Sequence, residues 1–381
     1  MKDTSQTFTQ TNNELPHLWQ KPSYTELLTC LEGLRVQLCV WNPRKQRQTS
    51  KTAPTYDRRE VISFLSSLIS SPLAWLSSDE EREVIWDQAS KRMAERCGRT
   101  AMGEITRHWP FSDPITGEEL TLSIREPPIT GDALGLKTWG SSYALAQLLP
   151  TFSSPGGPLS HLFPSPHHPS PSVSEILELG SGTGLLGLAA SLLWRARVAL
   201  TDLPDILPNL QHNADLNTQL LTSRGGSIRV APLTWGVTDP DRPADTDPSF
   251  VRRLHTYRLI LVADPLYDDD HPALLARAID EQLARDDAGA RALVMVPRRD
   301  ETTGRLLGEL RRLLAGKGVP IRCLVEDEVE GRDDWGGKPG NEEDDDEEEA
   351  VGEEGGRRVG FWWGVFGRER GLEMEESRQV A

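Results

Sequence analysis

The segment that most constrains the fold is 173–193, VSEILELGSGTGLLGLAASLL, in which an apolar run leads into a glycine-rich turn and a run of small and aliphatic residues. The first run is typical of a buried strand and the last of a helix. The glycines Gly180, Gly182 and Gly184 let the backbone turn sharply and approach a ligand closely, while the start of the helix offers free N–H groups to it. The segment therefore predicts a strand–turn–helix unit with a ligand at the turn.

The spacing of acids around this turn indicates which ligand it holds. A second short strand ends in Asp202, 18 residues after Gly184, and an acid there suits the two hydroxyls of a ribose. Two nucleoside cofactors remain open, a dinucleotide such as NAD and S-adenosyl-L-methionine. The spacing is G-x-G-x-G rather than G-x-G-x-x-G, and Glu178 precedes the first glycine by two residues. A carboxylate there would repel a pyrophosphate but suits a sulfonium and an ammonium group, so the sequence favours S-adenosyl-L-methionine.

Further strand-like runs follow in order along the chain, at 227–232, 257–267, 290–297, 319–326 and 356–366. Helix-like runs such as 271–285 and 303–318 lie between most of them. Strands that alternate with helices predict an α/β fold with a parallel sheet covered on both faces. The last two strands lack a helix between them, so we expect them to form an antiparallel pair.

Composition divides the 381 residues into an N-terminal extension over 1–104, mostly helical after about residue 57, and a larger domain over 105–381. We expect a hairpin around 113–117 at the start of that domain. Two insertions interrupt it. Residues 151–172 are rich in Pro, Ser and His and predict a flexible loop, and the acidic residues 333–356 predict a disordered one. Residues 326–354 carry 16 acids and two bases, so nearly all of the net charge of −16 is local.

The same features exclude several classes of protein. Because the remaining body is slightly acidic and lacks a broad basic stripe, direct nucleic-acid binding is not expected. No apolar run reaches the roughly 18 residues that a membrane span needs, and no signal segment is recognised. The four cysteines are scattered, which favours reduced thiols in a cytoplasmic or nuclear protein, and of these two compartments we expect the cytoplasm. Three histidines in the Pro/Ser-rich insertion have no acidic or cysteine partners, so no metal site is expected.

The fourth strand ends in Ala263-Asp264-Pro265-Leu266-Tyr267, at the edge of the sheet where this fold places its acceptor site. A carboxylate and an aromatic ring there can hold an amine by charge and by cation–π contact. The alternative is a plain turn in which Asp264 caps a helix and Tyr267 packs. D-P-P-Y at this place is typical of enzymes that methylate adenine or glutamine amines, but Leu266 stands where the second proline would be.

Together these motifs resemble those of the family-sixteen seven-β-strand protein-lysine methyltransferases. E-x-G-x-G-x-G and D-x-x-Y are both present, as are a tryptophan ahead of the glycine loop, Trp139, and a Trp-Gly pair after the third strand, Trp235-Gly236. The resemblance covers 105–366 apart from the two insertions. Segments 62–76, 85–102 and 203–213 look like the fungal branch that methylates a lysine of translation elongation factor 2.

The resemblance implies a seven-stranded Rossmann-like S-adenosyl-L-methionine-dependent fold with an N-terminal helical extension, acting on elongation factor 2. It implies that Glu178 faces the amino-acid or sulfonium end of the cofactor and that Asp202 holds the ribose. Gly180, Ser181, Gly182 and Ala263 would line the cofactor, Trp139 would lie near its methionine end and Trp235 beside the adenine. Asp264 and Tyr267 would guide the target amine. One alternative is a methyltransferase that acts on a nucleobase or a glutamine amine. Another is an inactive cofactor-binding protein, and the intact Glu178, Asp202 and Asp264 argue against this second alternative.

Overall fold

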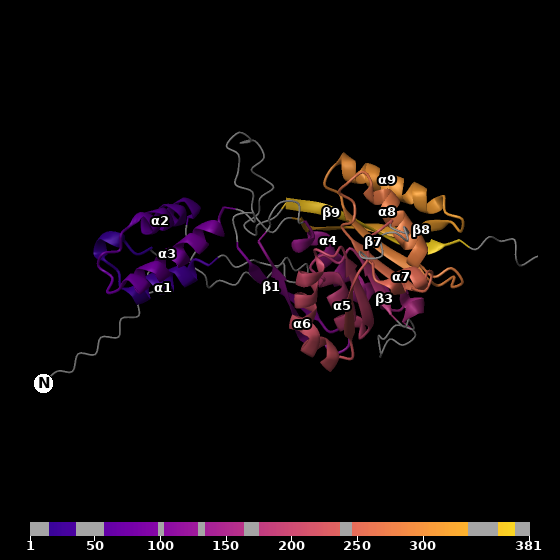
Figure 1. The fold of residues 1–381 in the computed structure, drawn as a ribbon, viewed down its shortest axis with the longest axis horizontal. Helices are drawn as coiled ribbons and strands as arrows, with labels where there is room; N and C mark the ends of the chain where they lie inside the picture. Colours follow the sequence, from indigo (N-terminus) through magenta and orange to yellow (C-terminus); the bar gives the residue numbers. More distant parts are fainter. Residues whose placement is uncertain are drawn as a thin grey trace, which may run out of the picture. The chain divides into compact units, whose positions relative to one another are not determined.

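A computed structural model describes residues 15–35, 57–97, 103–128, 134–163, 175–236, 246–333 and 357–369. The chain divides into two compact units (Figure 1), and the described residues up to Gly103 belong to the first and those from Glu104 onward to the second. None of the helices in these ranges is long and apolar enough to cross a membrane.

The first unit contains a short 3-10 helix, Leu18–Gln20, and three α-helices, α1 (Tyr24–Gly33), α2 (Arg58–Ser70) and α3 (Asp79–Ala94). Each α-helix begins at a side chain that accepts a hydrogen bond from the first turn: Ser23, Asp57 and Ser78. Their apolar faces form a separate small core. Arg96, one of the basic residues after α3, donates to the backbone oxygen of Leu34 at 2.6 Å and so links the end of α3 to the end of α1.

The second unit is built on a seven-stranded sheet in the order β5-β4-β3-β6-β7-β9-β8. Its strands are β3 (Ile176–Leu179), β4 (Arg197–Asp202), β5 (Ser227–Pro232), β6 (Leu259–Ala263), β7 (Arg291–Pro297), β8 (Ile321–Asp333) and β9 (Arg357–Arg368). The first five are parallel, and β9 is antiparallel to both of its neighbours. The predicted α/β class, the strand order along the chain and the final antiparallel pair are therefore confirmed.

Helices cover both faces of this sheet (Figure 1). On one face lie α4 (Gly140–Ser153), α5 (Leu185–Trp194) and α6 (Leu207–Ser223), and on the other α7 (Pro248–Arg252), α8 (His271–Gln282) and α9 (Glu301–Ala315). Strand β6 shows why both faces must be covered, because Leu259 and Leu261 are buried in one core while Ile260 and Val262 are buried in the other. Strands buried on both sides are nearly continuous apolar runs.

A β-hairpin precedes the sheet in the chain and packs against α6. Its strands are β1 (Ile105–Ser112) and β2 (Glu119–Glu126), which form a two-stranded sheet of their own. The outer edge of β2 is satisfied by amides of α6: Asn213 and Asn217 each donate to and accept from the backbone of Arg125 and Ser123, at 2.8–3.0 Å. Because these amides replace a neighbouring strand, the edge is closed by side chains. Asn213 also donates to the backbone oxygen of Thr183 in the glycine loop.

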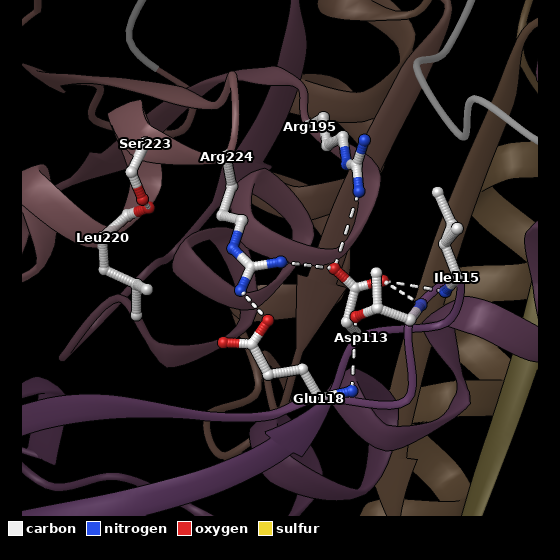
Figure 2. A network of polar contacts seen from close by, with 8 residues as sticks. Asp113, Ile115, Glu118, Arg195, Leu220, Ser223 and Arg224 are labelled. Carbon is white, nitrogen blue, oxygen red and sulfur yellow. Dashed lines mark hydrogen bonds and ion pairs between the residues drawn. The ribbon is translucent and has the colours of Figure 1, made fainter.

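The tip of the hairpin is held to the ends of α5 and α6 by charges (Figure 2). Asp113 is 5% exposed and accepts hydrogen bonds from the backbone N–H groups of Ile115 and Thr116 through Oδ1. Its Oδ2 lies 2.9 Å from Arg224 and 3.6 Å from Arg195, and Arg224 also pairs with Glu118. Burial raises the pKa of Asp113, but the two backbone hydrogen bonds and the two arginines outweigh it and hold the pKa below its ordinary value.

Removing the charge of Asp113 is expected to destabilise the second unit. Asp113→Asn keeps an oxygen for the two backbone donors and loses only the ion pairs, so the free energy of unfolding should fall by about 1–2 kcal/mol at pH 7. A group with a lowered folded-state pKa stabilises above its unfolded pKa, and this contribution is lost as the pH falls through the folded value. The difference in melting temperature between wild type and variant should therefore begin to shrink near pH 3.8 and vanish only below the lower pKa that Asp113 has in the folded protein. An equal difference at pH 3 and pH 7 would contradict this account.

The prediction of a flexible loop over 151–172 is wrong for residues 151–163. Residues 151–153 complete α4, and Ser160–Leu162 forms a 3-10 helix. The apolar side chains of Phe152, Leu159, Leu162 and Phe163 are buried in the core, and His161 Nε2 lies 2.8 Å from the backbone oxygen of Gly289. Residues 164–172 lie outside the described part of the chain.

The first acidic residues of the segment 326–354 belong to a strand and not to a loop. Strand β8 continues to Asp333 and pairs with β9 along its whole length, so the acids at 326–333 belong to the sheet. The rest of the loop that was expected over 333–356 lies outside the described residues.

Candidate functional site

The glycine loop between β3 and α5 adopts a backbone that side chains would obstruct. Gly182 has a φ of 55°, and a Cβ on it would lie 3.1 Å from the backbone oxygen of Gly135. Gly180 has a φ of 68°, and its Cβ would lie 3.0 Å from the Trp235 ring. Positive φ angles at both positions favour glycine on conformational grounds alone. The loop can therefore pack directly against Gly135 and the Trp235 ring.

A cavity of about 250 Å³ opens at this carboxyl edge of the sheet. Parallel α/β sheets bind their ligands at this edge because the loops that follow neighbouring strands converge there. The cavity is lined by nine of the ten residues that the sequence singled out: Trp139, Gly180, Ser181, Gly182, Asp202, Trp235, Ala263, Asp264 and Tyr267. Among the lining residues that sequence reasoning missed are Lys137, Thr183, Ile206 and His271.

Asp202, at the end of β4, joins the glycine loop to its own strand. Its Oδ2 accepts a hydrogen bond from Gly182 N–H and its Oδ1 one from Leu203 N–H, both at 2.7 Å. Burial raises the pKa of this carboxyl although both hydrogen bonds oppose the change. Each oxygen retains acceptor capacity, so the side chain can take two hydroxyl hydrogen bonds from a bound sugar. One loop N–H is already used by Asp202, which leaves fewer donors for a pyrophosphate.

Glu178 is the one predicted residue that does not line the cavity. Its side chain is buried under the loop, 2% exposed, and accepts a hydrogen bond from Gly187 N–H in α5 at 3.1 Å. A Cβ on Gly187 would lie 2.4 Å from the same carboxylate, so α5 can approach only because this position is glycine. Burial raises the pKa of Glu178 to about 8, despite hydrogen bonds from Ser181 and Gly187. The carboxyl therefore lies beneath the glycine loop and not at the wall of the cavity.

Two tryptophans line the cavity. Trp139 immediately precedes α4, and its ring lies 4.5 Å from Lys137 Nζ and 5.0 Å from Arg299 Cζ. Trp235 follows β5 and contacts the loop at Gly180, with its ring edge-on to His271. The Trp235 wall is apolar and aromatic and suits a flat base, whereas the Trp139 wall carries two cations.

The end of β6 supplies the polar groups of the remaining wall. Asp264 takes a left-handed backbone, with φ of 53°, and its N–H donates to the backbone oxygen of Met295 at 2.9 Å. Asp264 as a whole residue is 9% exposed, whereas Tyr267 is 60% exposed and its ring is edge-on to His271 at 4.1 Å. Burial and the negative charges of Asp202, Asp264 and Asp268 raise the pKa of the Tyr267 hydroxyl. Leu266 lies between them, buried in the core.

The most consequential residue that the sequence did not single out is Arg299, two residues after β7. Its Nη1 donates to Asp264 Oδ1 at 3.0 Å and its Nη2 to Asp264 Oδ2 at 2.5 Å. The only signal in the sequence is the Arg298-Arg299 pair at a strand end, and nothing local distinguishes one arginine from the other. The nucleoside of S-adenosyl-L-methionine fits the residues present, because the cavity combines the aromatic side chain of Trp235 with the glycine loop and with Asp202, whose carboxylate oxygens can accept hydrogen bonds from hydroxyl groups.

Comparison with known proteins agrees with this chemistry. A family model described as lysine methyltransferase matches residues 117–312. The chain is 28% identical over 275 residues to protein-lysine N-methyltransferase rrg1 of Schizosaccharomyces pombe, covering 72% of this chain and 79% of that protein. It is 30% identical over 270 residues to protein-lysine N-methyltransferase EFM2 of Saccharomyces cerevisiae, covering 68% of this chain and 58% of that protein. Over 100 residues, 26% of this chain and 36% of that protein, it is 40% identical to the mouse protein-lysine methyltransferase METTL21E.

The family match runs from the tip of the hairpin into α9 and so includes every lining residue of the cavity. The chain therefore belongs to the lysine methyltransferase family, enzymes that transfer a methyl group from S-adenosyl-L-methionine to lysine side chains of proteins.

Proposed function

We propose that this enzyme N-methylates a lysine of translation elongation factor 2. One observation supports methyl transfer to an amine: the glycine loop, Asp202, Asp264 and Tyr267 all line one cavity. The choice of substrate rests on the likeness of segments 62–76, 85–102 and 203–213 to the fungal branch that modifies this factor. The similarity to EFM2 extends over 270 residues, beyond the catalytic core that the family model matches.

Each cavity residue has a role in this proposal. Asp202 accepts hydrogen bonds from the ribose hydroxyls, and Gly180, Ser181 and Gly182 contact the cofactor with their backbone. Trp235 lies beside the adenine, Trp139 near the methionine end and Ala263 at the end of β6. Glu178 does not line the cavity. It supports the glycine loop from beneath, because its carboxyl binds both Ser181 in the loop and Gly187 in α5. When bound, S-adenosyl-L-methionine supplies a methyl group on a cationic sulfur.

The acceptor side is assigned to Asp264 and Tyr267. Tyr267 is the exposed aromatic group at the mouth, where its ring can contact the aliphatic and cationic end of a lysine. Asp264 lies deeper and offers carboxylate oxygens to the amine N–H groups. A planar adenine or glutamine amine would need the rigid D-P-P-Y turn, and this chain has Leu266 there instead, with its side chain buried in the core below.

Elongation factors work in the cytoplasm, so the proposed substrate also places the enzyme there. Cys30, Cys97 and Cys323 are free thiols among the described residues, which suits a reducing compartment.

Methyl labelling of a cell extract tests the proposed function. Extract from cells that lack the enzyme, supplied with methyl-labelled S-adenosyl-L-methionine and the purified protein, should give one main labelled band at the mass of elongation factor 2. Mass mapping of that band should find the label on a lysine, and an Asp202→Ala enzyme should give little label. A band of another protein would reject elongation factor 2 as the substrate, and label confined to nucleic acid would reject lysine methylation.

A further inference from the structure

The carboxylate of Asp264 is not an isolated charge at the acceptor end of the cavity. Parallel strands β6 and β7 are neighbours in the sheet, with Ala263 beside Met295, so the residues that follow them converge. Arg299 meets Asp264 there with two parallel N–H···O bonds, and the Asp264 side chain is 5% exposed. A two-pronged contact of this kind fixes the plane of the carboxylate as well as compensating its charge.

The other side of the Arg299 guanidinium faces the Trp139 wall. Its Cζ lies 5.0 Å from the centre of the Trp139 ring, a cation–π distance, while Lys137 Nζ lies 4.5 Å from the same ring. Arg299 is not itself among the residues that line the cavity, but both residues it holds are. Its contacts with Asp264 and Trp139 therefore connect it to the cavity.

The charges around this pair decide which form of a lysine amine the site prefers. The negative charge of Asp264 is compensated by Arg299, and Lys137 places a second positive charge next to the Trp139 ring. Asp202 and His271 also line the cavity, Asp268 is close enough to Tyr267 to raise its pKa, and Asp300 follows Arg299 in the chain. An ammonium that reached Asp264 would meet a carboxylate already neutralised by a guanidinium. A neutral amine can still donate to the carboxylate oxygens and keeps its lone pair for attack.

We propose that Arg299 is a positioning residue that neutralises and orients Asp264, so that the acceptor site takes the target lysine as its neutral amine. This inference rests on the proposed lysine methylation. The amine first releases its proton to water; its lone pair then forms the N–C bond as the S–C bond breaks, with the bonding electrons left on sulfur. The methylated ammonium that results loses a proton to solvent before any further transfer.

The pH dependence of kcat tests this role, because kcat reports groups in the enzyme–substrate complex. The acceptor is the protein that the wild type labels in the extract, purified without methylation. Arg299→Gln should move the rising limb of the kcat profile up by about one pH unit, because an uncompensated Asp264 favours the ammonium. At neutral pH this corresponds to about a tenfold loss of kcat. Arg299→Lys keeps the charge and should leave the limb near its wild-type position.

Two further variants separate charge from structure. Arg299→Gln/Asp264→Asn restores neutrality, so its rising limb should return to the wild-type pH even though kcat stays low. Arg298→Gln is the matched control, because Arg298 is half exposed and pairs with Glu328 outside the cavity. All variants should bind S-adenosylhomocysteine and melt within a few degrees of wild type.

Coincident rising limbs in wild type, Arg299→Gln and the double variant would overturn the role of Arg299 while leaving the proposed function intact. If the double variant kept the shifted limb, a general structural effect would explain the loss and the inference would be wrong. If the wild type labels no protein lysine at all, the proposed function fails first, and the inference fails with it.

Discussion

Asp264→Asn is expected to lower kcat/KM for the protein substrate by one to two orders of magnitude, about 1.4–2.8 kcal/mol of transition-state stabilisation. The substitution keeps the shape of the side chain and removes one acceptor oxygen and the charge. It also leaves Arg299 as an uncompensated cation beside the acceptor, since the guanidinium loses its two-pronged partner. Steady-state rates of methyl transfer to unmethylated substrate measure the effect.

The affinity for S-adenosylhomocysteine should change little, because Asp264 lies on the acceptor side. Asp269→Asn is a matched control five residues away, since the Asp269 side chain is 78% exposed and pairs with Arg305 outside the cavity. An Asp264→Asn enzyme with wild-type kcat/KM would remove Asp264 from the acceptor site. A parallel experiment with Leu266→Pro completes the D-P-P-Y turn, and methylated adenine or glutamine from that variant would contradict the lysine assignment.

Asp202→Ala is expected to weaken binding of S-adenosyl-L-methionine by about 1.5–3 kcal/mol, or roughly 10- to 150-fold in Kd. The variant loses the hydroxyl acceptors and also frees the N–H groups of Gly182 and Leu203, which Asp202 holds at 2.7 Å. Isothermal calorimetry at pH 7 measures the change directly. NAD should give no heat of binding with either protein.

Asp205→Ala is the control for this second substitution, because Asp205 is exposed three residues further along and does not line the cavity. Its affinity should match the wild type. Wild-type affinity in Asp202→Ala would show that this carboxylate does not hold the cofactor, and tight NAD binding would reject the cofactor itself.

Local patterns were sufficient to predict most of the fold. A strand buried on both faces is an almost unbroken apolar run, and β3, β4, β6 and β7 are all of this kind. The glycine turn was predictable because Gly180, Gly182 and Gly184 all take positive φ. Average composition failed at 151–163, where serine, proline and glycine surround four apolar side chains that the core needs.

The positions of cavity residues were predictable where a strand end determines them, as for Asp202, Ala263 and Asp264. Glu178 was predicted less well, because its direction depends on how closely α5 packs at Gly187, a contact nine residues away that no spacing rule contains. Arg299 could not be selected at all. Its partners are Asp264, 35 residues away, and Trp139, on a different element, and only the assembled sheet brings the three together.

The most direct test of the account is a single-turnover reaction with the acceptor protein and enzyme preloaded with methyl-labelled S-adenosyl-L-methionine. The product is hydrolysed to amino acids and the label is separated by chromatography. The account predicts that the label elutes as methylated lysine and that Asp264→Asn slows its appearance at least tenfold. Label in methylglutamine or a methylated base, or methylated lysine formed equally fast without Asp264, would contradict it.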